Sequence, residues 1–280
     1  MTEPWGPWVM WLRSIRLEDV GRVGAKAARL GQLVHGGFDV PDGFALTVDV
    51  LAHFLHHHGL SVSSDARVLH ESPLPEDVSA RLGAALTELG EGAVAVRSSG
   101  VEEDGAAASF AGQYDTVLDV RGLEALEAAV RRCWASALGE RVRLYAKRRG
   151  REVSLRMGVF VQRMLSPEAA GVMFTAHPVT GARGEVLIHS VRGLAERLVS
   201  GECVPDEWTV RGDDVRCHAN VEHSLTAAQA HALAMLARRV ERLCGQPQDI
   251  EWALTGGRLL LLQARPISAL PGPAARAPAH

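Results

Sequence analysis

The chain has 280 residues, of which 47% are hydrophobic and 22% are charged, and its net charge is −3. Such a chain is expected to bury a sizeable core, and without a basic stripe or clustered stacking aromatics it is not expected to bind nucleic acid. The apolar residues 5–12 are too few to span a bilayer and follow no basic leader, and the four cysteines show no paired spacing. We therefore expect a cytoplasmic protein with reduced thiols and no membrane partner.

Apolar spacing and turn residues predict mainly helices in the first half of the chain. Strands are expected at 5–12, 93–97 and 115–120, and helices at 24–36, 47–58, 76–89, 122–137 and 140–149. Thr47 is placed to cap the second of these helices.

Strands predominate after Leu155. They are expected at 156–162, 171–175, 185–191 and 207–211, followed by a helix at 226–243 and a hairpin over 249–265. This order predicts an α+β fold with mixed or antiparallel sheets. We place one domain at residues 1–270 and a disordered, linker-like tail at 271–280.

Lysine is rare in this chain. Of the 30 Lys and Arg residues only Lys26 and Lys147 are lysines, which suggests that a retained lysine needs a compact ammonium. Lys26 falls in the first turn of the helix predicted for GAKAARLG (24–31), where the helix dipole disfavours a cation unless an anion such as phosphate neutralises it. A solvated surface lysine is the alternative.

The segment AVAVRSSGVEEDGAAASFAGQYDT (93–116) indicates a phosphate site. A buried strand ends near Arg97, whose planar guanidinium suits phosphate oxygens. The small residues after it let backbone N–H groups approach an anion, and hydroxyl donors are added by Ser98, Ser99 and Ser109. A second wall would be formed by Gly112, Asp115 and Thr116. The alternative is a surface loop beside an arginine.

The segment DIEWALTGGRLLLLQARPIS (249–268) predicts a hairpin with one polar face. If Leu254 and Arg258 flank a three-residue loop, Glu251 lies opposite Leu261 and diagonal to Gln263. One face then carries Asp249, Glu251, Gln263 and Arg265, and the other carries Ile250, Trp252, Leu254, Leu260, Leu262 and Ala264. Oxygen atoms of Glu251 and Gln263 suit Mg²⁺. The alternative is an amphipathic hairpin with a solvated polar face.

The segment FVQRMLSPEAAGVMFTAHPVTG (160–181) adds a possible base contact. Gln162 ends an apolar strand, and its amide would meet a purine edge with Met164 against the ring. The alternative is an ordinary polar residue of an edge strand.

Taken in order, these motifs resemble the nucleotide-binding domain shared by pyruvate phosphate dikinase, phosphoenolpyruvate synthase and rifampicin phosphotransferase. The resemblance covers residues 8–268 and follows five blocks: VGAKAARLGQL…VPDGFALT, AVRSS…ED…ASFAGQYDT, VQRM…EAAGVMFTAHPVTG, GLAERLVSG…PDEW and PQDIEW…LLLQARPIS. It implies an ATP-grasp fold, in which two subdomains enclose ATP and Mg²⁺.

The resemblance also implies a role for each matching residue. Phosphates would be held by Lys26, Arg97 and Arg265, which are the implied catalytic residues. The same pocket would be lined by Gly112 and Thr116. Gln162 would lie beside the adenine, while Glu251 and Gln263 would hold Mg²⁺.

The sequence departs from the family pattern in three ways. No segment resembles the family's phosphorylatable histidine motif. His177 stands in the TAHP turn where the family usually carries Asn, and we interpret it as a residue satisfied within that turn. Ala195 replaces the middle glycine of a Gly-Leu-Gly-Glu pattern and is expected to stiffen a phosphate-side loop.

We therefore expect an ATP-dependent phosphotransferase component. Its acceptor would be a histidine domain on a partner chain or a small molecule. Two alternatives stay open: a non-catalytic ATP-binding module that regulates or docks to a partner, and an ATP-grasp ligase that makes an acyl phosphate.

Overall fold

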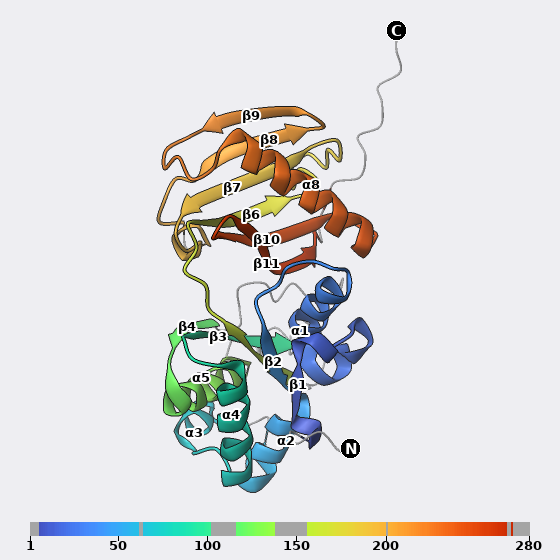
Figure 1. Ribbon diagram of the computed structural model, residues 1–280. Helices are drawn as coiled ribbons and strands as arrows, with labels where there is room; N and C mark the ends of the chain where they lie inside the picture. The colour runs from blue at the N-terminus through green and yellow to red at the C-terminus, as the bar shows by residue number, and fades with distance from the viewer. Residues whose placement is uncertain are drawn as a thin grey trace. The chain divides into compact units, whose positions relative to one another are not determined.

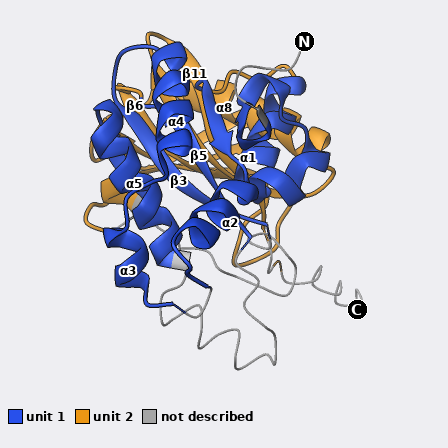
Figure 2. Ribbon diagram, turned by 90° about the horizontal axis from the view of Figure 1, so that it is seen from below, with its two compact units in different colours: residues 1–35, 41–164 blue, residues 36–40, 165–280 orange. Residues whose placement is uncertain are grey.

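The computed structural model describes residues 6–61, 64–101, 116–137, 156–199, 201–267 and 270. Figure 1 shows its helices and strands, and Figure 2 shows its two units: unit 1 contains residues 1–35 and 41–164, and unit 2 contains residues 36–40 and 165–280. Each unit is built on its own sheet, and all strand pairs in the described ranges are antiparallel. The predicted α+β class is confirmed. The helix predicted at 140–149 and the tail at 271–280 lie outside the described residues.

Unit 1 holds a five-stranded sheet with the order β1-β2-β5-β3-β4. Its strands are β1 Val9–Trp11, β2 Gly43–Leu46, β3 Val94–Gly100, β4 Thr116–Val120 and β5 Met157–Arg163. The apolar run of β5 makes it the central strand, with its first six residues buried.

The helices of unit 1 are α1 Val20–His35, α2 Val48–His57, α3 Ala66–Glu71, α4 Glu76–Leu89 and α5 Gly122–Ala137. The predicted bounds of α4 and α5 are confirmed. Helix α4 has acidic residues in its first turn, where they favour the dipole, and ends at Gly90, whose φ is 95°. In the core, Phe54 of α2 packs against Trp134 of α5 with ring centroids 5.2 Å apart.

The predicted capping of α2 by Thr47 is wrong. The Thr47 side chain makes no hydrogen bond to the helix, and its hydroxyl donates instead to the Pro7 carbonyl (3.2 Å). The buried hydroxyl therefore ties the start of α2 to the N-terminal segment beside β1.

Unit 2 holds a six-stranded sheet with the order β11-β10-β6-β7-β8-β9. Its strands are β6 Ala169–Phe174, β7 Val186–Arg192, β8 Asp206–Arg211, β9 Asp214–Ala219, β10 Gln248–Thr255 and β11 Arg258–Pro266, and its helices are α7 Glu196–Val199 and α8 Ala227–Cys244. Strand β9 was not predicted, because its side chains are mostly exposed and give no apolar alternation.

Helix α8 covers one face of the unit 2 sheet (Figure 1). It begins with a capping box between Thr226 and Gln229 and ends at Gly245, which has the left-handed conformation. The row of paired residues beneath it is buried and contains Ile250, Met173, Ile188 and Trp208.

Side chains alternate along a strand, so the residues that directly precede and follow the buried ones point to the opposite face of the sheet. We call this opposite face the polar face. One row contains Glu251, Val172, His189 and Glu207. The other contains Asp249, Phe174, Leu187, Thr209 and Arg216. All these side chains are partly or fully exposed.

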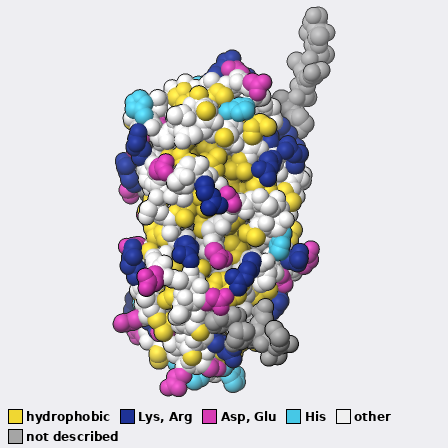
Figure 3. All heavy atoms as spheres, viewed as in Figure 1, with side chains coloured by type: hydrophobic (Ala, Val, Ile, Leu, Met, Phe, Trp, Pro, Cys, Tyr) yellow, Lys and Arg dark blue, Asp and Glu magenta, His cyan; other side chains and the backbone are white. Residues whose placement is uncertain are grey.

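Acidic and basic side chains are interspersed over the surface seen in Figure 3, in keeping with the small net charge. None of the helices in the described ranges combines the length and apolar character that a membrane crossing needs.

Asp206 fastens the loops at one end of the unit 2 sheet. Its buried carboxylate accepts hydrogen bonds from the Ser224 hydroxyl (2.6 Å), the Ser224 N–H (2.7 Å) and the Glu222 N–H (2.8 Å). Burial by itself would raise the pKa of Asp206, but these hydrogen bonds favour the ionised form and hold the pKa below its ordinary value. The loop at 220–224 is thereby attached to the start of β8.

We predict that Asp206→Asn lowers the free energy of unfolding by about 1–3 kcal/mol at neutral pH, because an amide cannot accept all three hydrogen bonds. The folded-state pKa of Asp206 lies below its unfolded value. The stabilisation is therefore present above the unfolded pKa and is lost as pH falls through the folded pKa. Urea unfolding of both proteins at neutral and acidic pH measures this difference.

Asp214→Asn is the matched control, because Asp214 is exposed and, within the described ranges, its carboxylate forms an ion pair only with the exposed Arg216 (2.9 Å). A surface pair of this kind contributes little. Equal losses in the two variants, or a difference that grows with acid, would contradict the account.

Candidate functional site

Lys26 follows a break in helix α1. Gly24 has φ 82° and ψ 167°, outside the helical range, so the helix bends there. After the bend, the Lys26 ammonium donates a hydrogen bond to the Ser98 carbonyl (3.0 Å), and the Ala27 N–H donates to the Ser99 hydroxyl (3.2 Å). Lys26 is thus held beside the two residues that follow Arg97 in β3.

Glycine is required at position 24 because α1 approaches Ser99 of β3 so closely there. A Cβ at this position would lie 1.9 Å from the Ser99 carbonyl oxygen, and its positive φ is strained for any L side chain. Gly24 was not among the predicted site residues. The available signal was a glycine at the first residue of the predicted helix 24–36, two residues before the rare lysine.

Arg97, Thr116 and Gln162 share one face of the unit 1 sheet. Arg97 pairs with Thr116 of β4, and Gln162 of β5 lies opposite the residue two positions before Arg97. Ser99, which α1 contacts, lies two positions after Arg97. Because residues two apart on a strand point to the same side, Lys26 joins these three residues on one side of unit 1.

Gln162 belongs to the central strand β5, so the edge-strand alternative is wrong. Its side chain is 3% exposed, and its amide nitrogen donates to the Pro41 carbonyl (3.3 Å). The Met164 sulfur accepts a hydrogen bond from the Asp119 N–H (3.1 Å). The contact of Gln162 with a purine stays a prediction, and the predicted site residue Gly112 lies outside the described residues.

The β10–β11 hairpin turns over two residues. Gly256 and Gly257 both have positive φ, and Thr255 lies opposite Arg258. The predicted three-residue loop is therefore wrong. Two consecutive glycines supply the left-handed conformations that a two-residue turn needs.

A β-bulge between Glu251 and Trp252 shifts the register once more, so Glu251 lies directly opposite Gln263 and not opposite Leu261. Leu261 instead faces Trp252 and is fully buried, whereas Leu262 is partly exposed. The predicted apolar-face positions of Leu260 and Leu262 are wrong for this reason. The predicted grouping on the polar face is confirmed for Asp249, Glu251, Gln263 and Arg265.

Arg265 is bound to Asp249, with its Nε and Nη2 atoms 2.9 Å and 2.8 Å from Oδ2. Burial raises the pKa of Asp249 above its ordinary value; the Arg265 guanidinium opposes this shift and the neighbouring Glu251 carboxylate adds to it. The Glu251 carboxylate thus adds negative charge beside Asp249, where a cation is favoured.

The oxygen atoms at this place are of the kind that Mg²⁺ prefers. Glu251 and Gln263 lie opposite each other, and Asp249 is two positions from Glu251 on the same strand. Within the described ranges, no group of three or more His, Cys, Asp or Glu side chains could hold a metal ion. A magnesium ion would therefore need waters and substrate phosphates as its other ligands.

Of the three departures from the family pattern, the two residue substitutions, His177 and Ala195, fit their local backbone. His177 Nδ1 accepts hydrogen bonds from the Val179 N–H (3.2 Å) and the Thr180 N–H (3.3 Å), so its interpretation as a satisfied turn residue is confirmed. Ala195 lies in the turn before α7 and does not have a positive φ, so alanine fits there without backbone strain.

The predicted site residues divide between the units. Lys26, Arg97, Thr116 and Gln162 belong to unit 1, and Glu251, Gln263 and Arg265 belong to unit 2.

The chain is similar to a family named for binding AMP or ATP, and to longer proteins named as a phosphotransferase and a synthase. The family model described as "Pyruvate phosphate dikinase, AMP/ATP-binding domain" matches residues 20–223 and 213–279. A rifampicin phosphotransferase from Streptomyces sp is 38% identical over 314 residues, which cover 95% of this chain and 36% of that protein. A probable phosphoenolpyruvate synthase from Methanothermobacter thermautotrophicus is 32% identical over 317 residues, which cover 94% of this chain and 46% of that protein. The chain thus spans less than half the length of either relative.

Among solved structures, a D-alanine–D-alanine ligase from Bacillus anthracis complexed with ATP matches with a TM-score of 0.36 and 10% sequence identity, over 86% of this chain and 53% of that chain. A similarity of this size supports no assignment of residues or activity.

We predict that Gly24→Ala weakens ATP binding about tenfold or more, because the new methyl group forces α1 away from Ser99 and moves Lys26 from its place. Isothermal titration with ATP measures the affinity, and thermal unfolding measures the accompanying loss of stability.

Gly59→Ala is the matched control, because Gly59 also has a positive φ (62°) but no atom of the described residues lies within 4 Å of its Cβ position. This variant carries the backbone strain without the collision. If both variants bind ATP as the wild type does, the contact does not position Lys26 for nucleotide.

Proposed function

The chain belongs to the family of the pyruvate phosphate dikinase AMP/ATP-binding domain, and on that premise we propose that it is the ATP-binding component of a phosphotransferase. ATP supplies the phosphoryl group. The acceptor is a histidine domain on a partner chain or a small molecule. Because the chain spans less than half the length of its relatives, the transfer itself is part of the proposal.

The observation that carries this proposal is the placement of two cations beside one strand, β3, in which Arg97 is the middle residue, whereas the sequence had suggested that it was the last one. The Lys26 ammonium is bound to the carbonyl of Ser98, the residue directly after Arg97, and both cationic side chains are partly buried. Two positive charges on one side of a sheet create a potential that attracts an anion. A polyphosphate is such an anion, and a guanidinium and an ammonium are the groups that proteins use to hold it.

In unit 2 we propose that Glu251 and Gln263 hold Mg²⁺, with Asp249 beside them and Arg265 contacting phosphate. The arrangement of two carboxylates and one amide on the polar face supports this assignment. Bound Mg²⁺ would neutralise charge on the phosphate oxygens. The protein residues then orient the phosphates and hold the transferred phosphoryl group in one position for reaction.

The other site residues complete the nucleotide pocket of the proposal. Thr116 stands opposite Arg97 and adds a hydroxyl donor. Gln162 lies on the same face of the sheet, where its amide oxygen can accept from an adenine amino group.

An inactive ATP-binding module is less well supported than an enzyme. The sequence arguments for it are the alanine in the Gly-Leu-Gly-Glu pattern and the missing match to the family's histidine motif. The first is weakened because Ala195 has no positive φ that would need glycine. An ATP-grasp ligase would share the fold and is distinguished by ADP formation that depends on a carboxylic acid.

We predict that the purified chain with ATP and Mg²⁺ forms AMP only when a histidine-domain partner is present, or ADP only with a small-molecule acceptor. Chromatography that separates AMP from ADP measures the products. Omitting Mg²⁺ should stop the reaction, and Arg97→Ala should reduce it by at least about a hundredfold, since the guanidinium acts on developing phosphate charge.

Arg121→Ala is the matched control, because Arg121 lies in the same unit but is exposed, and its ion pair in the described part of the chain is with the exposed Asp119 (2.9 Å). It should turn over ATP at the wild-type rate. Stoichiometric ATP binding without any product, with partner and candidate acceptors present, would contradict the enzyme proposal.

A further inference from the structure

Glu168 joins the start of β6 to the turn of the β10–β11 hairpin. It directly precedes β6, and its N–H donates a hydrogen bond to the Leu254 carbonyl (2.8 Å). Its side-chain Oε1 accepts a hydrogen bond from the Gly256 N–H (2.7 Å). Gly256 is the first residue of the two-residue turn. One exposed carboxylate thus holds the residue at which the hairpin begins to reverse direction.

The backbone around Glu168 is fixed by hydrogen bonds that do not involve its side chain. The Glu168 carbonyl accepts from the Gly193 N–H (3.1 Å), and the Thr255 hydroxyl donates to the Ser166 carbonyl (3.4 Å). These bonds place the Glu168 carboxylate within reach of the turn. Because they persist when the side chain is replaced, a substitution at this position removes the contact with the turn and little else.

The turn sequence alone does not select the observed register of the hairpin. Glycine adopts the conformations of longer loops as readily as those of a two-residue turn. Strand β10 is paired with β6 on its other side, with Leu254 opposite Ala169, so a longer loop would shift β11 and not β10. Such a shift would move Gln263 away from Glu251. The hydrogen bond to the Gly256 N–H fixes the conformation at the first turn residue and so favours the observed loop.

Other contacts also hold β11, which lies at the edge of the unit 2 sheet. The Asp39 carbonyl accepts from the Leu261 N–H (2.8 Å), and the Asp39 carboxylate pairs with Arg258 (3.1 Å). The Leu261 side chain is fully buried. Loss of the Glu168 contact should therefore loosen the pairing of Gln263 with Glu251 without unfolding the hairpin.

We propose that Glu168 is a positioning residue for the Mg²⁺ site, an inference that rests on the proposed function. Its carboxylate holds the turn, the turn sets the loop length, and the loop length sets which residue of β11 lies opposite Glu251. In the observed register that residue is Gln263. Glu168 acts through the turn and not by contact with the ion. Replacing a residue that orients metal ligands typically lowers metal affinity by about ten- to a hundredfold. We expect the lower end of that range, because Asp39 and Leu261 also hold β11.

The test measures ATP binding by calorimetry, in Mg²⁺ and again in EDTA, for the wild type, Glu168→Ala and Glu168→Gln. Glu168→Ala should weaken binding about tenfold in Mg²⁺ and leave it unchanged in EDTA, because only the metal ligands are displaced. Glu168→Gln keeps an acceptor oxygen for the Gly256 N–H and should bind within about twofold of the wild type in both conditions. Equal losses in Glu168→Gln and Glu168→Ala would assign the effect to charge and overturn the proposal, as would equal losses in Mg²⁺ and in EDTA.

Two further measurements follow the turn itself. Hydrogen–deuterium exchange of residues 255–258 should be faster in Glu168→Ala, because the Gly256 N–H loses its acceptor. Gln263→Ala provides a double-mutant cycle, in which adding Glu168→Ala should weaken binding in Mg²⁺ hardly further, because the ligand that Glu168 positions is already absent. Full additivity of the two substitutions, or wild-type exchange in Glu168→Ala, would contradict the positioning role.

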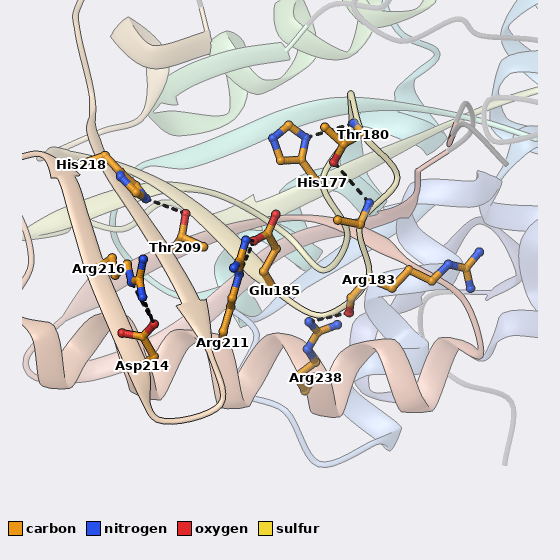
Figure 4. A network of polar contacts seen from close by, with 11 residues as sticks. His177, Thr180, Arg183, Glu185, Thr209, Arg211, Asp214, Arg216, His218 and Arg238 are labelled. Carbon is orange, nitrogen blue, oxygen red and sulfur yellow. Dashed lines mark hydrogen bonds and ion pairs between the residues drawn. The ribbon is translucent and has the colours of Figure 1, made fainter. Parts of the chain in front are cut away.

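Asp214→Ala is the matched control. Asp214 is also an exposed carboxylate beside a hairpin turn, but it lies in β9 at the opposite edge of the same sheet, where it pairs with Arg216 (Figure 4). This variant should bind ATP as the wild type does in both conditions and exchange residues 255–258 at the wild-type rate. Thermal unfolding, measured on every variant, shows that each protein is folded. A loss of Mg²⁺-dependent binding as large as that of Glu168→Ala would show that the effect is not specific to the turn and would overturn the proposal.

Failure of the proposed function has a different signature. The wild type would then bind ATP in neither condition, or Gln263→Ala would bind ATP in Mg²⁺ as well as the wild type does, and either result removes both proposals. If Gln263→Ala loses Mg²⁺-dependent binding while Glu168→Ala keeps it, the Mg²⁺ site stands and the positioning role of Glu168 is overturned alone.

Discussion

The contact between α1 and β3 is the constraint on which the unit 1 site depends. Gly24 lacks a side chain and takes a conformation that breaks the helix, so the chain can approach the Ser99 carbonyl. Only this approach lets the Lys26 ammonium reach the Ser98 carbonyl beside Arg97. The Lys26 ammonium is thereby fixed by backbone geometry beside the residue that follows Arg97 in β3, and we propose that both cations contact a polyphosphate there.

In unit 2 the alternation of side chains along the strands gathers polar residues on one face of the sheet. Helix α8 buries one face, so the apolar residues lie there and the polar face collects the rest. Asp249 and Glu251 occupy that face at a cost, because burial and mutual repulsion raise the pKa of Asp249. A glycine turn and a β-bulge then bring Gln263 directly opposite Glu251. Residues far from the hairpin, such as His189, share the same surface through strand pairing alone.

Much of this arrangement was predictable from the sequence, and the failures have identifiable causes. The bounds of α4 and α5, the strand that carries Arg97 and the polar grouping of Asp249 with Glu251 all follow from local periodicity. The hairpin register does not follow from local periodicity. The two-residue turn and the β-bulge each shift the strand pairing by one residue, and neither changes the amino-acid composition of the hairpin. The role of Gly24 depends on a carbonyl 75 positions later in the chain, which no local pattern reports. Strand β9 was missed because its exposed residues show no apolar alternation.

The most direct test of the central claim compares the binding of ATP and of adenosine to the wild type and to Lys26→Met by calorimetry. The account predicts that Lys26→Met weakens ATP binding by about ten- to a hundredfold, the usual effect of losing a charged hydrogen bond, and leaves adenosine binding unchanged. An ATP affinity that does not change in this variant would contradict it, because the placement of Lys26 beside Arg97 would then serve no phosphate.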